Sequence, residues 1–175
     1  CALPICGLFR PRLDHAAVLR EITMTDNVKD TLEYADIAVG FQFPGPTVPV
    51  TREMIAEFAA ASFDHNPLHW DNDFMEKTHF AGGKQFDDVI GHGLMTYSLM
   101  TRAMTDWLWP DLGEHRRLET RFRKPVYPGD EITIQGEVVD KRETAKGKWL
   151  VCNITVKNQR GETVATGDGL AEVFA

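Results

Sequence analysis

Apolar residues recur at helical spacing in two stretches of the chain. After Thr51, whose hydroxyl suits a helix N-cap, they predict a helix of about three turns that ends near Phe63. From Gly93 to Leu108 they cover most of the helical circumference, which is typical of a buried helix, and Pro110 marks its end. The pattern therefore predicts a short helix early in the chain and one long, almost wholly apolar helix near its middle. Asp71 and Asn72 could cap a second short helix that runs through Lys77.

In the second half of the chain, apolar and polar residues alternate as they do in half-buried strands. The alternation covers residues 132–138 and 150–156, and a turn at Asn158–Gly161 leads into a last strand at Thr163–Phe174. Residues 33–50 are rich in Gly and Pro and predict a loop or an edge strand. Together these elements predict an α+β fold with one central buried helix and an antiparallel sheet.

The chain has 175 residues, of which 43% are hydrophobic and 26% are charged, and this is the composition of an ordinary globular protein. The formal net charge of -7 argues against nucleic-acid binding but is compatible with a small anionic ligand. No apolar run approaches the ~20 residues needed to span a bilayer, so no membrane association is expected. The cysteines number 3, fit no metal or disulfide framework, and favour reduced thiols in a cytoplasmic protein.

The start of the chain differs from the rest. Met24 and the residues after it read like a natural start, which suggests that residues 1–23 are an extension, although an N-terminal helix is the alternative. We therefore divide the chain into an N-terminal extension of unknown role, residues 1–32, and a single domain, residues 33–175. No chemistry is assigned to the extension.

Two polar motifs lie between the predicted helices. The first is Asp64–His69 (Asp-His-Asn-Pro-Leu-His) and the second is Ile90–Gly93 (Ile-Gly-His-Gly). Pro67 cannot sit inside a helix without loss of a hydrogen bond, so the first motif is predicted to be a loop or a sharp break. On an ideal helix Asp64 and His69 would lie about 140° apart, whereas a loop kinked at Pro67 can turn both toward one water. Such a carboxylate and imidazole can share general acid–base catalysis.

These motifs give the sequence a resemblance to a known family. Asp-x-Asn-Pro-x-His, followed by Ile-x-His-Gly at the start of an apolar helix, resembles the MaoC-like dehydratases, which include the R-specific enoyl-CoA hydratases. The stretch Phe122–Asp130 is similar to that family's Phe-x-x-Pro-Val-x-x-Gly-Asp motif, and the resemblance spans roughly residues 35–174. It implies a single hot-dog fold, in which an antiparallel sheet wraps a long helix. It also implies a homodimer or higher homo-oligomer with active sites near the subunit interface.

The activity that the resemblance implies is acyl-thioester hydration and dehydration. Water would add reversibly to a 2-enoyl-CoA or acyl-carrier thioester, with coenzyme A as part of the substrate and with no metal or separate cofactor. Asp64 and His69 would be the acid–base pair. Gly93 opens the apolar helix, where unpaired N–H groups and the positive dipole end point outward, so its N–H is the expected donor to the thioester oxygen.

Three further residues receive expected roles near the substrate. Asn66 is expected to shape the loop or to bind the water, and His92 is expected to support the site without transferring protons. By resemblance, Thr101 flanks the acyl pocket and influences the chain length that it accepts. The alternative for Thr101, a hydroxyl bonded to the helix backbone, carries equal weight.

Two other interpretations concern charged or metal-binding groups. His65 and His69 have the i,i+4 spacing of a metal pair, but that spacing needs a continuous helix, which Pro67 interrupts. The basic residues Arg121, Arg123 and Lys124 could meet the phosphates of coenzyme A, but a solvated strand face is the preferred interpretation.

Two rival functions remain from other classes. A hot-dog thioesterase would resemble proteins that place a carboxylate on the central helix, yet this helix has no Asp or Glu before Asp106. A non-catalytic acyl-CoA-binding protein would not need the Asp64 and His69 pair. Both rivals therefore fit the motifs less well than a hydratase does.

Overall fold

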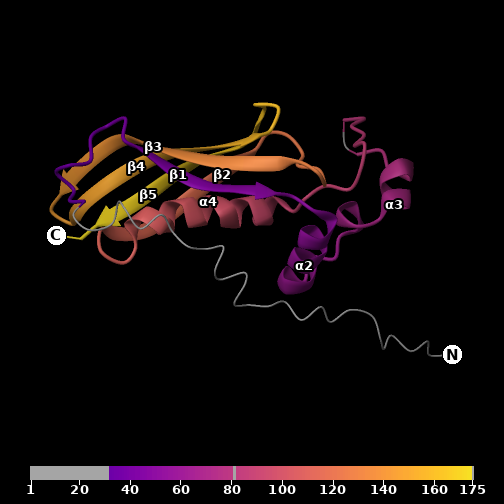
Figure 1. Cartoon of the computed structure of the whole chain (residues 1–175), viewed down its shortest axis with the longest axis horizontal. Coiled ribbons are helices and arrows are strands. Elements are labelled where there is room, and N and C mark those ends of the chain that lie inside the picture. The colour runs from indigo at the N-terminus through magenta and orange to yellow at the C-terminus, as the bar shows by residue number, and fades with distance from the viewer. Residues whose placement is uncertain (1–31, 81, 175) are drawn as a thin grey trace. The chain divides into compact units, whose positions relative to one another are not determined.

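An antiparallel sheet and one long helix make up most of the fold (Figure 1). The computed structural model describes residues 32–80 and 82–174, so the extension predicted for residues 1–32 lies outside the described residues apart from Leu32. The elements follow in the order β1 (Gln42–Pro49), α2 (Arg52–Ser62), a 3-10 turn (Pro67–His69), α3 (Asn72–Lys77), α4 (Gly93–Leu108), β2 (Gly113–Phe122), β3 (Glu131–Thr144), β4 (Gly147–Asn158) and β5 (Thr163–Val173).

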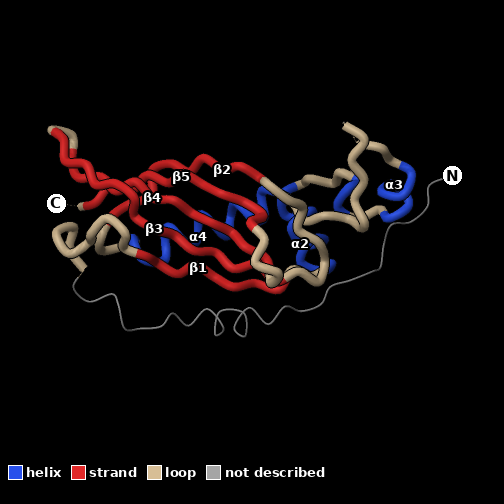
Figure 2. The backbone as a smooth tube through the Cα atoms, turned by 90° about the horizontal axis from the view of Figure 1, so that it is seen from above, coloured by secondary structure: helices blue, strands red, loops and turns tan. Residues whose placement is uncertain are grey.

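The strands form one sheet in the order β1-β3-β4-β5-β2, with every neighbouring pair antiparallel (Figure 2). The Gly- and Pro-rich stretch contains β1, so the edge strand, rather than a loop alone, is confirmed. A register shift between Pro44 and Thr47 interrupts its pairing with β3. This shift agrees with the poor fit of proline to a regular ladder. The strand β2 at the other edge was not predicted.

The helix α4 packs against the sheet, and its buried side chains are Met95, Thr96, Met100, Ala103, Met104 and Leu108. Its other side is open in the single chain, where the Leu94 side chain is 59% exposed and Ser98 is also exposed. The sequence predicted burial around most of the helix, and the structure buries one side of it. Among the described helices, none is long and apolar enough to cross a membrane.

A close contact between two strands locks the core beside α4. Phe43 of β1 is 2% exposed, and its ring stacks on Trp107 of α4 with 4.6 Å between ring centroids. The ring lies over Gly136 of β3, where a Cβ atom would overlap it. Glycine at this position therefore permits the aromatic stack that fastens the end of α4 to the sheet.

Beyond one end of the sheet, near the start of α4, lie the short helices α2 and α3 (Figure 1). The N-cap predicted for α2 is confirmed, because the Thr51 hydroxyl accepts the Met54 N–H at 3.1 Å. The predicted end is confirmed too, because α2 stops at Ser62 and Phe63 takes a left-handed conformation with φ of 59°. This sharp turn sends the chain back toward the start of α4.

Candidate active site

The chain after α2 breaks at Pro67, as the sequence predicted. Pro67–His69 form a single 3-10 turn, and the Asn66 side-chain oxygen caps it by accepting the Leu68 N–H at 3.3 Å. The helix thus ends before the motif, and the turn brings His69 back over Asp64. Asn66 shapes this loop, which is one of the two roles expected for it.

The carboxylate of Asp64 and the imidazole of His69 face each other. Asp64 Oδ1 accepts the Asn66 N–H at 3.3 Å, which orients the carboxylate. Asp64 Oδ2 lies 3.9 Å from His69 Nε2, which is too long for a direct hydrogen bond. The Asp64 side chain is 45% exposed and that of His69 only 9%, so the pair lies between solvent and the interior.

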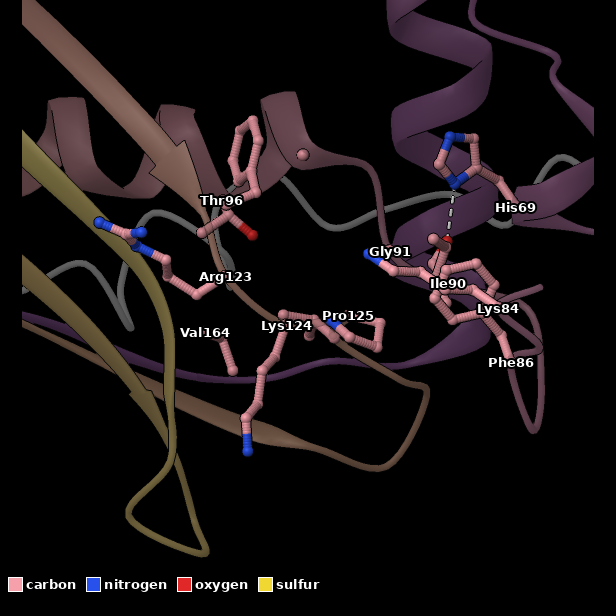
Figure 3. A pocket seen from close by; sticks show the side chains of 13 residues that line it. His69, Lys84, Phe86, Ile90, Gly91, Thr96, Arg123, Lys124, Pro125 and Val164 are labelled. Atoms are coloured by element: carbon pink, nitrogen blue, oxygen red, sulfur yellow. Dashed lines mark hydrogen bonds between the residues drawn. The ribbon is translucent and has the colours of Figure 1, made fainter. Parts of the chain in front are cut away.

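A backbone contact fixes the proton on His69. Its Nδ1 lies 2.7 Å from the carbonyl oxygen of Ile90, which can only accept, so Nδ1 carries the hydrogen and donates (Figure 3). In the neutral ring, Nε2 is then an unprotonated acceptor that faces Asp64. Burial lowers the pKa of His69 most strongly, and the nearby His92 lowers it further against the opposing effects of Ile90 and Asp64. The site therefore favours the neutral imidazole.

His92 contacts both members of the pair. Its ring stacks on that of His69, with 3.6 Å between centroids and 20° between planes. Its Nε2–H donates to the backbone carbonyl oxygen of Asp64 at 3.1 Å. The residue is 1% exposed, and its Nδ1 finds no partner among the described residues. These contacts hold the two motifs together across a long loop.

A cavity of about 300 Å³ reaches this site (Figure 3). Its lining residues are His69, Lys84, Phe86, Ile90, Gly91, Gly93, Thr96, Phe122, Arg123, Lys124, Pro125, Val126 and Val164. The wall is mostly apolar and also carries a few polar side chains, as is typical of small-molecule sites.

Gly93 is the first residue of α4 and lines the cavity. Among the described residues, no acceptor is found for its N–H, as expected for the first turn of a helix. A Cβ atom at Gly93 would lie 2.9 Å from the Phe122 ring, so packing is a second reason for glycine here. The structure thus brings Gly93 and His69 to one cavity, with Asp64 beside it.

Thr101 does not line the cavity, and its hydroxyl donates to the Tyr97 carbonyl oxygen at 3.1 Å. This contact is the backbone bond that the sequence left as the alternative, while the role of Thr101 in chain-length selection stays a prediction. Thr96, which sequence reasoning missed, lines the cavity from the same helix. The apolar pattern covered most of α4 and gave no signal for which of the two hydroxyl-bearing residues lines the cavity.

The basic side chains at the end of β2 and just after it, Arg121, Arg123 and Lys124, each contact a partner. Arg121 pairs with Asp168 at 2.9 Å, and Lys124 pairs with Glu162 at 2.6 Å. Arg123 Nε donates to a threonine hydroxyl of β5 at 3.4 Å. Arg121 therefore belongs to a solvated strand face, as preferred from the sequence, whereas Arg123 and Lys124 lie beyond the strand and also line the cavity.

A metal site is the alternative interpretation of these histidines. Donor atoms of Asp64, His69 and His92 lie within 4.8 Å of one another, and His65 does not belong to this group. Each ring donates one N–H to a carbonyl oxygen, which leaves its other nitrogen available as a possible ligand. However, the two rings are stacked nearly parallel. Lone pairs of parallel rings do not converge on one ion, so the arrangement fits a metal poorly. The absence of metal stays a prediction.

Known proteins are similar to this chain in sequence and in fold. The family model described as MaoC like domain matches residues 38–159. The (R)-specific enoyl-CoA hydratase of Aeromonas caviae is 32% identical over 120 residues, which cover 68% of this chain and 83% of that protein. The mitochondrial 3-hydroxyacyl-(acyl-carrier-protein) dehydratase of Arabidopsis thaliana is 33% identical over 123 residues, which cover 69% of each chain.

Among solved structures, the (R)-hydratase from A. caviae involved in PHA biosynthesis has a TM-score of 0.67 and 27% identity, over 79% of this chain and 98% of that one. The fold is therefore a hot-dog fold, as the resemblance implied. The chain belongs to the MaoC-like domain family. This family includes relatives named as hydratases and dehydratases of acyl thioesters.

Proposed function

We propose that this protein catalyses the reversible addition of water to a 2-enoyl thioester, which yields a 3-hydroxyacyl thioester. The observation that carries this proposal is the 3.9 Å approach of the Asp64 carboxylate to the neutral His69 nitrogen at one end of the cavity. Relatives named enoyl-CoA hydratase and 3-hydroxyacyl dehydratase support the same reaction class.

The geometry suits activation of one water. Asp64 Oδ2 and His69 Nε2 are both acceptors, and a water between them can donate one hydrogen bond to each. As its oxygen attacks the β-carbon, the pair takes one proton. The pair then returns a proton to the α-carbon, so the net change is the addition of H and OH across the double bond. Neither side chain is altered at the end of the cycle.

The Gly93 N–H is the proposed donor to the thioester oxygen. Negative charge builds on this oxygen as water attacks, and the first turn of α4 offers an unpaired N–H at the positive end of the helix dipole. One such donor typically contributes about 3 kcal/mol to the transition state. Asn66 and His92 hold the loop and the pair, and no separate cofactor takes part in these steps.

Hydration is tested by mixing the purified protein with a short panel of 2-enoyl-CoA thioesters. We expect the absorbance of the conjugated double bond to fall as the enoyl thioester is hydrated. In a separate reaction that starts from the 3-hydroxyacyl thioester, the same absorbance should rise. Free thiol is measured in the same reactions. Thiol release without loss of the double bond would show a thioesterase, and tight binding with neither change would show an acyl-CoA-binding protein.

The rate should depend on the protonation of His69. Protonation of Nε2 removes the acceptor for water, so kcat/KM is expected to fall as the pH is lowered. Because burial lowers the pKa of His69 below its ordinary 6.5, the midpoint of this acid limb should lie below pH 6.5. A profile of kcat/KM from about pH 5 to 8 measures it in the free enzyme. A midpoint above 6.5 would contradict the neutral-ring assignment.

A second copy of the chain is the proposed partner. The Leu94 and Phe122 side chains are 59% and 53% exposed, although both are large and apolar. They lie near the start of α4 and at the end of the edge strand β2, and the Phe122 ring also lines the cavity. Burial of this surface in a homodimer would protect the cavity from solvent.

A further inference from the structure

The segment Lys124–Asp130 connects β2 with β3 and forms one wall of the cavity. Lys124, Pro125 and Val126 line the cavity directly. The carbonyl oxygen of Val126 accepts the N–H of Gly91 at 2.8 Å. The wall segment therefore contacts the motif that opens α4, two residues before the proposed oxyanion donor.

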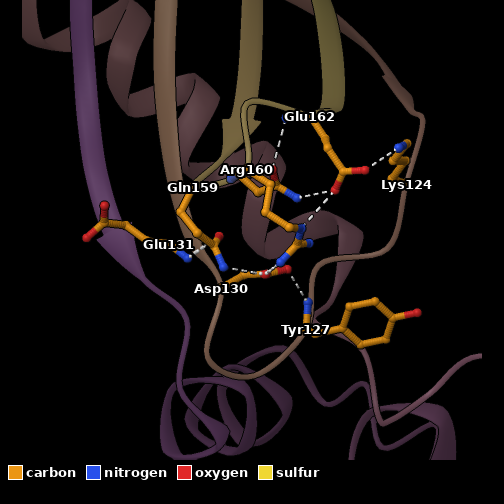
Figure 4. A network of polar contacts seen from close by, with 8 residues as sticks. Lys124, Tyr127, Asp130, Glu131, Gln159, Arg160 and Glu162 are labelled. Carbon is orange, nitrogen blue, oxygen red and sulfur yellow. Dashed lines mark hydrogen bonds and ion pairs between the residues drawn. The ribbon is translucent and has the colours of Figure 1, made fainter.

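One end of this wall segment is held by a buried carboxylate. Asp130 is 3% exposed, and its Oδ2 accepts the Tyr127 N–H at 3.0 Å (Figure 4). Its Oδ1 accepts hydrogen bonds from Arg160 Nη1 at 2.7 Å and from Gln159 Nε2 at 3.0 Å. Burial by itself would raise the pKa of Asp130, but these hydrogen bonds outweigh burial and lower it. Asp130 is therefore a buried carboxylate whose charge is stabilised by two side chains of the turn between β4 and β5.

The other end of the wall segment is held by the same turn. Lys124 Nζ pairs with Glu162 Oε1 at 2.6 Å, and Arg160 Nε donates to Glu162 Oε2 at 3.0 Å (Figure 4). The hydrogen bond from Lys124 is the largest of several contacts that lower the pKa of Glu162 to about 2. Arg160 and Glu162 thus connect both ends of the wall segment to one hairpin turn.

The wall segment also contacts the element that carries Asp64. The Val50 N–H donates to the Asp130 carbonyl oxygen at 2.7 Å, and the Gly129 N–H donates to the Val50 carbonyl oxygen at 2.8 Å. Val50 directly precedes the N-cap of α2, and α2 ends just before the Asp64 loop. The same segment therefore supports both halves of the candidate site.

We propose that Arg160 is a positioning residue for the acid–base site and acts together with Glu162 through the wall segment. Arg160 is half-exposed, belongs to a surface turn, and does not line the cavity. It acts by holding the wall segment in place, and that segment fixes Gly91 at one side and the start of α2 at the other. The catalytic part of this inference rests on the proposed hydration of enoyl thioesters.

The test compares Arg160→Gln with Arg160→Lys, which keeps a charge for Asp130. We expect Arg160→Gln to lower kcat for enoyl-CoA hydration about tenfold while KM changes much less, because misplaced groups cost most in the transition state. Arg160→Lys should recover part of kcat. Hydrogen exchange at the Gly91 amide should become faster in Arg160→Gln, since its acceptor on Val126 is no longer held.

Arg142→Gln is the matched control, because it removes the same charge from a surface pair with Asp140 at the far end of the β3–β4 hairpin. It should leave kcat and Gly91 exchange unchanged. Unchanged exchange at Gly91 in Arg160→Gln overturns the proposal, and so does faster exchange with unchanged kcat. The exchange measurement does not require turnover. If the wild-type protein hydrates no enoyl-CoA, the proposed function fails and Gly91 exchange alone decides whether Arg160 holds the wall.

Discussion

Replacing Asp64 by Asn or His69 by Ala is expected to reduce the rate of enoyl-CoA hydration at least about 100-fold. Asp64→Asn keeps the shape of the side chain but replaces one carboxylate oxygen with an NH₂ group, which donates hydrogen bonds and cannot take a proton from water. His69→Ala removes the Nε2 acceptor and also the contact to Ile90. Because the two side chains act on one water, the double variant should lose little more than the worse single variant. Initial rates on a 2-enoyl-CoA measure all three.

His65→Ala is the control for this prediction. His65 belongs to the same loop and is exposed, and among the described residues its carbonyl oxygen, rather than its ring, makes the hydrogen bond, which it accepts from Trp70. Its variant should keep wild-type turnover, and unfolding curves should show that all the variants remain folded. Wild-type turnover in the Asp64→Asn, His69→Ala double variant would refute the assignment of the acid–base pair.

Gly136→Ala is expected to lower the free energy of unfolding by about 3 kcal/mol, as overpacking of a tight core does. The added methyl group overlaps the Phe43 ring, which is fully enclosed and stacked on Trp107. The ring cannot move aside without breaking that stack and shifting the end of α4. Urea unfolding of the variant and the wild-type protein measures the loss.

A second substitution distinguishes a collision with Phe43 from a loss of stability that any side chain at this position of β3 would cause. Phe43→Leu makes room beside Gly136, so the double variant with Gly136→Ala should lose less stability than the sum of the two single variants. Additive losses would show that Phe43 does not collide with the new side chain. An unfolding midpoint for Gly136→Ala equal to that of the wild-type protein would refute the predicted overlap.

The sequence predicted those elements whose pattern is local. The helix from Gly93 to Leu108 has the predicted bounds, because an apolar run ended by a nearby proline needs no distant contact to be recognised. The strand β2 was missed, since half of the residues of Gly113–Phe122 are charged and the stretch gives no clear alternation. It is an edge strand, and it is extended because its backbone pairs with β5, a distant contact that its own residues do not predict.

The parts of the candidate site that depend on consecutive residues were likewise predictable, and those that depend on distant contacts were not. The kink at Pro67 and the facing of Asp64 and His69 follow from six consecutive residues, as the side-chain contact shows. The stacking of His92 on His69 joins residues separated by a long irregular stretch, so no local pattern could reveal it. The tautomer of His69 depends on one carbonyl oxygen of that same stretch, which is visible only in three dimensions.

The β3–β4 turn and the β4–β5 turn should differ in how well they tolerate inserted sequences. A reporter peptide inserted at the exposed Ala145–Lys146 turn would extend from a region without contacts to the cavity wall. The same insertion beside Arg160 would separate the guanidinium from Asp130, although that turn looks equally accessible from its surface exposure. Fusion tags, circular permutation and surface immobilisation should therefore use the β3–β4 turn and leave the β4–β5 turn intact.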